Sequence, residues 1–421
     1  MADGSHGLFR DRLLDSSLYY GWYVVIGCFL LTFMTAGTIF SFSVFLGPVI
    51  ATFDQSAANT SLVFGLQSLV TFSGAAILGF GVDRYGVRRL LAIAAVLIVV
   101  GLGGASQAPT FLGVVVGYSV VAAAGLGITF VVAYTTPPRW FERRRGLATG
   151  VAVSGWGVGI LVMPPLVDRL IDTFGWQGTY LWLAAMFLVA IAGSVALLAT
   201  RPSDLEVDVS AEFDDPTGVV AARSVRTQVG EAARTALTPM FGLVFVGLLF
   251  AFVPAYAVLV FLVEFAESTG AGRRAGVLGV SALGAMNIVA KFAAGEIADR
   301  VGPDLTMAGF VALMCVVTPM MVAFPTPASI VVLAALFGFG YGGIAALMSP
   351  LMADLFGTAD LSTLFGLTCI GFAVGGTVIP YLVGFGFDVF GTYDVPFLIA
   401  AVLGFAAAGA FLAIRALRPT E

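Results

Sequence analysis

Residues 79–86 read GFGVDRYG, and residues 295–302 read GEIADRVG. A glycine, an aspartate, an arginine and a second glycine fall at the same places in both strings, 216 residues apart. The same offset carries a further set of residues onto their counterparts: Gly150, Gly155, Gly159, Pro164, Asp172 and Gly175 match Gly366, Gly371, Gly375, Pro380, Asp388 and Gly391. Two separate regions that match at one offset indicate an internal repeat, and hence two homologous halves.

The composition predicts that both halves lie in a membrane. Hydrophobic residues make up 59% of the 421 residues and charged residues only 11%, whereas soluble domains carry about 25% charged residues. The net charge of −5 gives no indication of nucleic-acid binding. Three cysteines, at positions 28, 315 and 369, lie in apolar runs and predict no disulfide framework.

Apolar stretches long enough to cross a bilayer recur along the chain. A spanning helix needs about 20 such residues, and twelve stretches qualify: 20–50, 60–82, 89–107, 110–136, 146–171, 174–199, 239–265, 275–299, 304–324, 327–353, 361–387 and 393–415. The sequence therefore predicts an all-α polytopic membrane protein of twelve transmembrane helices in two pseudo-repeated six-helix bundles. We expect an N-terminal bundle in 1–199, a charged cytoplasmic linker in 200–238 and a C-terminal bundle in 239–421.

The arginines orient these spans. With the N-terminus inside, sixteen arginines fall on the cytoplasmic side: 10, 12, 84, 88, 89, 139, 143, 144, 145, 201, 223, 226, 234, 300, 415 and 418. Only arginines 169, 273 and 274 fall outside. Cytoplasmic loops carry the excess of positive charge, so both termini are expected in the cytoplasm and the protein in the plasma (cytoplasmic) membrane.

Lys291 is the only lysine of the chain, and it lies inside the apolar span 275–299. A cation at that depth is costly, so it usually faces a cavity or a partner and marks the path of a substrate or an ion. Asn287 lies four residues earlier, on the same helical face. Snorkelling is the alternative, but Asp299 at the span end is eight residues away, or about 12 Å at 1.5 Å per residue. Lysine covers only part of that distance, so the position indicates an anion-binding site.

Several strings resemble a known family. The Gly-x-x-x-Asp-Arg-x-Gly pattern after the second span resembles the cytoplasmic loop signature of the major facilitator superfamily, over nearly the whole chain. Further strings narrow the resemblance to the monocarboxylate transporters and their prokaryotic oxalate/formate antiporter relatives: Tyr20-Gly21-Trp22, the run from Trp140 to Gly155, Gly340-Tyr341-Gly342-Gly343 and Asp388-x-x-Gly391-x-Tyr393.

The resemblance implies a role for Lys291. Those relatives commonly carry an acid or an asparagine in span 8, followed four residues later by arginine, so Lys291 takes the place of the substrate-binding cation. Two departures stand out. The family's animal members carry a lysine in span 1, and dicarboxylate antiporters carry a second cation in span 11, and both are absent here. One cation suits one carboxylate, and lysine lacks the bidentate fork of arginine.

Other residues complete the expected site. Mid-span polar or aromatic side chains predicted to shape a small, mostly apolar substrate pocket, besides Lys291 and Asn287, are Thr38, Trp156, Tyr256, Tyr341 and Cys369. Residues of the repeated loop motif are expected to anchor or gate the cytoplasmic end rather than to bind substrate: Gly79, Asp83, Arg84, Gly86, Gly295, Asp299, Arg300 and Gly302.

These observations predict a secondary active transporter of small monocarboxylates, working by alternating access and coupled to protons. Carboxylate exchange, and facilitated export of another small organic solute, stay open as alternatives, as does a nutrient sensor on a transporter scaffold. A retinal photoreceptor is disfavoured by twelve spans and the repeat. We expect no enzyme activity, because the one histidine, His6, lies in the polar N-terminal tail and no phosphate-binding loop occurs. No cofactor or metal is expected, and the partners are a small organic anion, a proton and the lipid bilayer, with the monomer as the functional unit.

The orientation is tested by thiol labelling. A cysteine introduced between residues 205 and 220 should react with a membrane-impermeant reagent only from the cytoplasmic side, because the linker is predicted to lie there. Labelling of that cysteine in intact cells would contradict the orientation.

Overall fold

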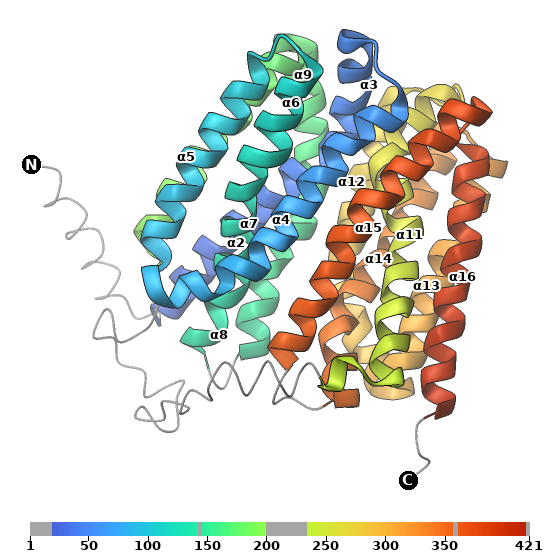
Figure 1. Ribbon diagram of the computed structural model, residues 1–421. Helices are drawn as coiled ribbons and strands as arrows, with labels where there is room; N and C mark the ends of the chain where they lie inside the picture. Colours follow the sequence, from blue (N-terminus) through green and yellow to red (C-terminus); the bar gives the residue numbers. More distant parts are fainter. Residues whose placement is uncertain (1–18, 142–144, 199–233, 357–360, 418–421) are drawn as a thin grey trace, which may run out of the picture. The chain divides into compact units, whose positions relative to one another are not determined.

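The computed structural model describes residues 19–141, 145–198, 234–356 and 361–417. Every regular element in these ranges is a helix (Figure 1). In chain order the helices are α2 (Gly21–Phe40), α3 (Phe42–Phe53), α4 (Ala57–Tyr85), α5 (Val87–Ser106), α6 (Phe111–Val114), the π-helix η1 (Val115–Ala122), α7 (Ala123–Thr135), α8 (Pro137–Trp140), α9 (Arg145–Leu197), α11 (Pro239–Ser268), α12 (Arg273–Val301), α13 (Pro303–Ala323), α14 (Pro327–Phe356), α15 (Leu361–Phe390) and α16 (Asp394–Leu417).

Each of the twelve predicted spans has a helix at its place, which confirms the predicted all-α class. Within the described ranges, ten helical stretches are long and apolar enough to cross a membrane. One of them, Leu147–Leu197, covers two predicted spans, 146–171 and 174–199, which form α9 with a break at Gly175. Helix α4, at the predicted span 60–82, is not among the ten. Most of the predicted linker 200–238 lies outside the described residues.

Contacts divide the chain into two compact units, which are Met1–Ile39, Val70–Gly159 and Thr173–Ala221 (unit 1), and Phe40–Leu69, Ile160–Asp172 and Ala222–Glu421 (unit 2). These units do not coincide with the two halves of the repeat. Helix α3, the first part of α4 and the middle of α9 come from the first half of the sequence, yet they pack within unit 2. The predicted domains 1–199 and 239–421 remain a prediction that rests on the repeat.

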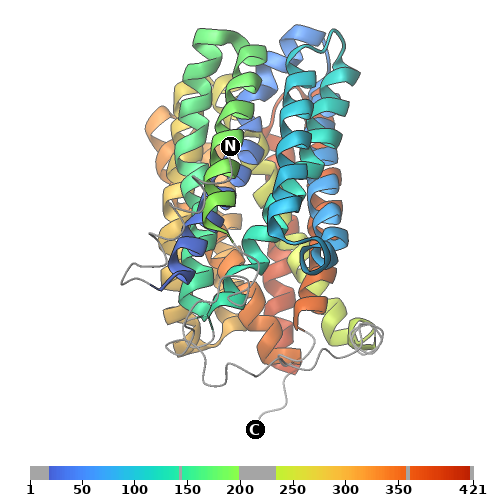
Figure 2. The ribbon, with the colours of Figure 1, turned by 90° about the vertical axis from the view of Figure 1, so that its left-hand side faces the viewer.

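Unit 2 therefore holds the C-terminal six spans together with parts of three N-terminal ones. Its long helices, coloured from yellow to red, run alongside one another in both views (Figure 1, Figure 2). Helix α11 is the most enclosed of them, with buried side chains on every turn from Ala251 to Val263. Being apolar on all sides, it is typical of a helix surrounded by other helices.

The repeat is also present in the backbone. Positive φ angles occur at Gly86 and Gly302 (77° and 93°), and at Gly175 and Gly391 (70° and 71°). The residues of each pair are 216 apart, the offset found in the sequence. Since side chains disfavour this backbone region and glycine does not, both halves place glycine where the chain turns from one span into the next. Asp54 (φ 50°) and Gly270 (φ 80°) form a third pair at that offset.

Helix packing repeats at the same offset. In unit 1, Gly155 of α9 lies against the backbone of Phe29 in α2. In unit 2, Gly371 of α15 lies against the ring of Phe245 in α11, 3.1 Å from where a Cβ would stand. Adding 216 to the residue numbers of the first contact gives the residue numbers of the second. Small residues permit such close approach where no hydrophobic effect drives helices together.

The seam between α12 and α14 is closer still. A Cβ on Gly342 would stand 2.5 Å from the backbone oxygen of Asn287 and 2.7 Å from its Cα. One turn earlier, a Cβ on Gly338 would collide with the backbone of Leu283. Two glycines four residues apart therefore fix α14 directly against the turn of α12 that carries Asn287.

This seam should not accept a methyl group. We expect Gly342→Ala to lower the stability of the detergent-solubilised protein by about 1–3 kcal/mol, because the added atom must push α14 away from backbone. Gly309→Ala is the matched control, since a Cβ there meets nothing within 4 Å. Thermal unfolding of both variants checks this, and equal melting temperatures would contradict the account of the seam.

Candidate anion-binding site

Lys291 lies in the middle part of α12, on a face that turns toward protein. Seven residues separate it from Gly284, which places both on nearly the same side of the helix, about 10 Å apart along the axis. At Gly284 that side packs against the backbone of Ile160 and Leu161 in α9. Lys291 is half-buried, whereas its neighbour Phe292 is 74% exposed. The lysine thus lies on the side of α12 that approaches α9, and the phenylalanine on the open side.

Asn287 is completely buried, with 0% exposure. Neither Nδ2 nor Oδ1 of its side chain has a hydrogen-bond partner among the described residues. A buried polar group without a partner costs about 1–3 kcal/mol, so its presence inside a span is not explained by packing. The carboxamide of Asn287 offers two N–H donors and one carbonyl acceptor, and it lies one turn before the ammonium of Lys291. These groups suit a small polar ligand.

Aromatic side chains from α11 and α14 form a cluster in the same unit. The ring of Phe252 lies 6.0 Å from that of Tyr256 and 6.0 Å from that of Tyr341. Tyr256 donates its hydroxyl hydrogen to the carbonyl of Phe372, at 3.1 Å. Tyr341 immediately precedes Gly342, the residue that contacts Asn287. Of the predicted pocket residues, Asn287 lies at the seam between α12 and α14, Tyr341 lies next to that seam, and Tyr256 is near Tyr341 through Phe252. Lys291 follows Asn287 by one turn on α12, on the side that approaches α9.

The remaining predicted pocket residues are Thr38, Trp156 and Cys369. Thr38 and Trp156 lie in unit 1. Thr38 is buried, its hydroxyl has no hydrogen-bond partner among the described residues, and its carbonyl accepts from Tyr118 at 3.2 Å. Trp156 packs edge-on against Phe130, with ring centroids 5.8 Å apart. The side chain of Cys369 lies outside the described residues.

The loop-motif residues are described only in part. Gly86 and Gly302 take the positive φ angles that begin α5 and α13. Arg300 is exposed and pairs with Glu296 one turn earlier on α12. Asp299 and Gly295 are exposed on the same helix. Gly79, Asp83 and Arg84 are described only in their helical backbone, so their gating role stays a prediction.

Sequence reasoning missed an acid in an apolar run. Glu264 lies within the predicted span 239–265, and it is half-buried in α11. Its Oε1 is buried against Gly47 of α3 and has no hydrogen-bond partner in the described structure. The signal was present, because a lone carboxylate in an apolar segment indicates a functional position by the same argument that singles out Lys291.

The fold and the site define a class. Paired helical repeats, glycine-lined seams and one cation inside a span are features of a membrane transporter. The chain belongs to the major facilitator superfamily, whose family model matches residues 28–286 and 244–421. It is an integral, multi-pass membrane protein, and its relatives are transporters rather than enzymes.

Within the superfamily, the chain is similar to curated monocarboxylate transporters. Monocarboxylate transporter 12 of Xenopus laevis is 25% identical over 399 residues, which cover 90% of this chain and 85% of that protein. Monocarboxylate transporter 11 of Mus musculus is 28% identical over 404 residues, covering 93% and 86%. The resemblance to monocarboxylate transporters expected from the motifs is thereby confirmed.

Solved structures show the same fold at low identity. A D-xylose-proton symporter superposes with a TM-score of 0.70 at 14% identity, covering 95% of this chain and 98% of that one. A bacterial homologue of the human lysosomal transporter Spinster gives a TM-score of 0.67 at 15% identity, covering 96% and 100%. These matches support the fold alone.

The burial of Asn287 predicts that its substitution lowers transport without lowering thermal stability. We expect Asn287→Leu to keep or raise the melting temperature, because it removes buried polar atoms that have no hydrogen-bond partner within the described ranges, and to reduce transport. Thr71 occupies the equivalent position of the first half and donates to the carbonyl of Ala123 at 3.2 Å. Thr71→Val should therefore lower the melting temperature slightly. A large loss of stability in Asn287→Leu would show that the amide serves the fold instead.

Proposed function

We propose that this protein carries small monocarboxylates, of the size of lactate or pyruvate, across the membrane by alternating access. The Lys291 ammonium is the counter-charge of the carboxylate, and the Asn287 amide binds beside it. The observation that carries the proposal is the placement of the chain's one lysine on the protein-facing side of a membrane span, one turn after a fully buried amide. The polar atoms of that amide have no hydrogen-bond partner in the part of the chain that the structure describes.

The number of cations favours a single carboxylate. The offset of 216 maps Lys291 onto Ala75 and Asn287 onto Thr71, so the first half supplies no second charge at the equivalent place. Residues 367–376, where a second cation would be expected for a dicarboxylate, carry no charged side chain. The names of the curated relatives support the same substrate class.

Lys291 also supplies a route for coupling to protons. Asn287 does not titrate, so it provides no acid beside the site. An ammonium that releases its proton in the empty, dehydrated site and regains it when a carboxylate binds would take up one proton with each anion. Such a cycle is electroneutral and needs no acid in the site.

Anion exchange is the second candidate, and the neutral Asn287 is the observation that favours it. If Lys291 stays charged throughout, the carrier without substrate keeps that positive charge in the site and returns across the membrane only with another anion. Export of a different small organic solute is the further alternative. In either case we place both termini in the cytoplasm, the protein in the plasma membrane, and the functional unit as the monomer.

Substitution of Lys291 tests the site. In proteoliposomes with labelled lactate or pyruvate, Lys291→Met should reduce uptake to the protein-free background, because it keeps the aliphatic stem and removes the charge. Lys291→Arg keeps the charge and should retain part of the uptake with altered selectivity. Carboxylate uptake by Lys291→Met at the wild-type rate would show that the substrate binds elsewhere.

The same vesicles distinguish the two coupling modes. Vesicles without internal anion should take up carboxylate faster when an inward proton gradient is imposed. Uptake that ignores the gradient, and that rises strongly with carboxylate inside, would refute symport and establish exchange.

A further inference from the structure

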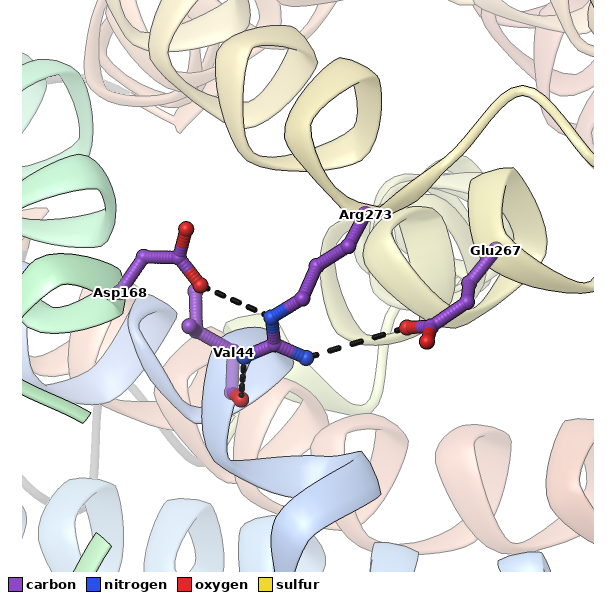
Figure 3. Close-up of polar contacts among 4 residues, drawn as sticks. All are labelled: Val44, Asp168, Glu267 and Arg273. Carbon is purple, nitrogen blue, oxygen red and sulfur yellow. Dashed lines mark hydrogen bonds and ion pairs between the residues drawn. The ribbon is translucent and has the colours of Figure 1, made fainter. Parts of the chain in front are cut away.

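Two equivalent helices of unit 2 are fixed at their first residues. At the start of α12, Arg273 donates from Nε to Oδ1 of Asp168 in α9, at 2.9 Å, and from a terminal nitrogen to the carbonyl of Val44 in α3, at 2.8 Å (Figure 3). At the start of α4, the backbone N–H groups of Ala57 and of the next residue donate to Asp388 in α15, both at 3.1 Å. The pair α12–α9 and the pair α4–α15 are each set in register, so equivalent positions along them can be compared.

A further contact of these two helix pairs is related by the repeat. Adding 216 to Ser68 of α4 gives Gly284 of α12, and subtracting 216 from Gly376 of α15 gives Ile160 of α9. Gly284 packs against the backbone of Ile160, and Gly376 packs against the side chain of Ser68. The contact between α12 and α9 is made without a hydroxyl at this position. Helix packing alone therefore does not account for a serine at position 68.

The hydroxyl of Ser68 is not bonded to its own helix. Serine and threonine inside helices commonly donate to a carbonyl three or four residues earlier. Ser61 donates in this way to Ala58 at 2.8 Å, and Ser281 to Val277 at 3.2 Å. Ser68 is completely buried, and its Oγ has no hydrogen-bond partner among the described residues. Because a buried hydroxyl without a partner is costly, this arrangement favours a ligand atom as the partner.

Tyr256 of α11 approaches Ser68 with the end of its ring that carries the hydroxyl. A Cβ on Gly376 would stand 3.1 Å from Oγ of Ser68 and 3.2 Å from Cζ of Tyr256. Tyr256 donates its own hydroxyl hydrogen to the carbonyl of Phe372, at 3.1 Å, so its oxygen serves a ligand as an acceptor. Ser68 has a hydrogen to donate. One donor and one acceptor side by side are the complement of an alcohol.

This pair of hydroxyls lies near the level of the proposed anion site. The residue equivalent to Ser68 on α12 precedes Asn287 by three residues and Lys291 by seven. Along the helix axis, Ser68 is therefore about 5 Å from the level of Asn287 and about 10 Å from that of Lys291. The lysine side chain, together with a small hydroxy acid, covers that difference.

We propose that Ser68 and Tyr256 bind a hydroxyl group next to the substrate's carboxylate, so that the transporter selects 2-hydroxy acids over 2-oxo acids and over unsubstituted acids. This inference rests on the proposed function, in which Lys291 binds the carboxylate. Ser68 donates to the substrate oxygen, and the substrate's hydroxyl donates to Tyr256. A keto oxygen accepts from Ser68 alone, and a plain alkyl chain leaves both protein groups without a ligand partner.

Three acids that differ only at the second carbon test the site. In proteoliposomes, the inhibition constants of unlabelled lactate, pyruvate and propionate are measured against uptake of labelled lactate, and we expect the parent to bind them in that order of affinity. Ser68→Ala should weaken lactate and pyruvate by about fivefold to tenfold, the change expected for one hydrogen bond, and leave propionate unchanged. Tyr256→Phe should weaken lactate alone, because only the alcohol donates to Tyr256.

A matched control lies on the same helix. Ser61 is as buried as Ser68 but is bonded to its own backbone, so Ser61→Ala should leave the ratio of the propionate and lactate constants unchanged. The melting temperature of Ser68→Ala should equal or exceed that of the parent, because the variant removes a buried hydroxyl and keeps the packing.

The outcomes separate the hydroxyl site from the proposed function. A parent that binds lactate and propionate equally would overturn the hydroxyl site and leave the role of Lys291 standing. The same conclusion would follow if Ser68→Ala kept the parent's ratio or weakened all three acids equally. A parent that takes up neither labelled lactate nor labelled propionate would overturn the proposed function, and this inference with it.

Discussion

The cost of holding an ammonium within a membrane span governs this structure. A lysine at the centre of a spanning helix costs about 2.5–3.5 kcal/mol on insertion scales, so it persists only where the protein provides for it. Here α12 turns Lys291 toward the side on which Gly284 meets α9, and a buried amide precedes it by one turn. The glycines of α14 then fix that turn of α12 at backbone distance. An anion that occupies the site for part of the transport cycle would explain why the ammonium of Lys291, the buried amide of Asn287 and the close α12–α14 contact occur together.

The repeat explains how the frame around the site is built. Equivalent glycines take the same positive φ in both halves, and equivalent helix pairs meet at equivalent residues. The chemistry at these positions has diverged. Among the described residues, the side chain of Thr71 is hydrogen-bonded and that of Asn287 is not. Ala75 stands in the first half where Lys291 stands in the second. The symmetric frame therefore carries different side chains at equivalent positions, with the chain's one lysine in the second half.

Much of this followed from the sequence because the signals were local. Apolar length predicted the helices, the offset predicted the repeat, and the rarity of lysine singled out Lys291. Arg273 and Asp168 are different, because they are 105 residues apart and each reads as an ordinary loop or span-end charge. Their pairing depends on which helix ends meet in space. The same holds for the grouping of α3 with the C-terminal spans, which no local pattern predicts.

The most direct test of the central claim is a structure with a labelled carboxylate. Crystals grown with 3-bromopropionate would locate the bromine by anomalous scattering and the carboxylate from the density. We expect a carboxylate oxygen within about 2.7–3.2 Å of Nζ of Lys291, with the Asn287 amide as its second partner. A carboxylate bound with no contact to Lys291 would contradict the account.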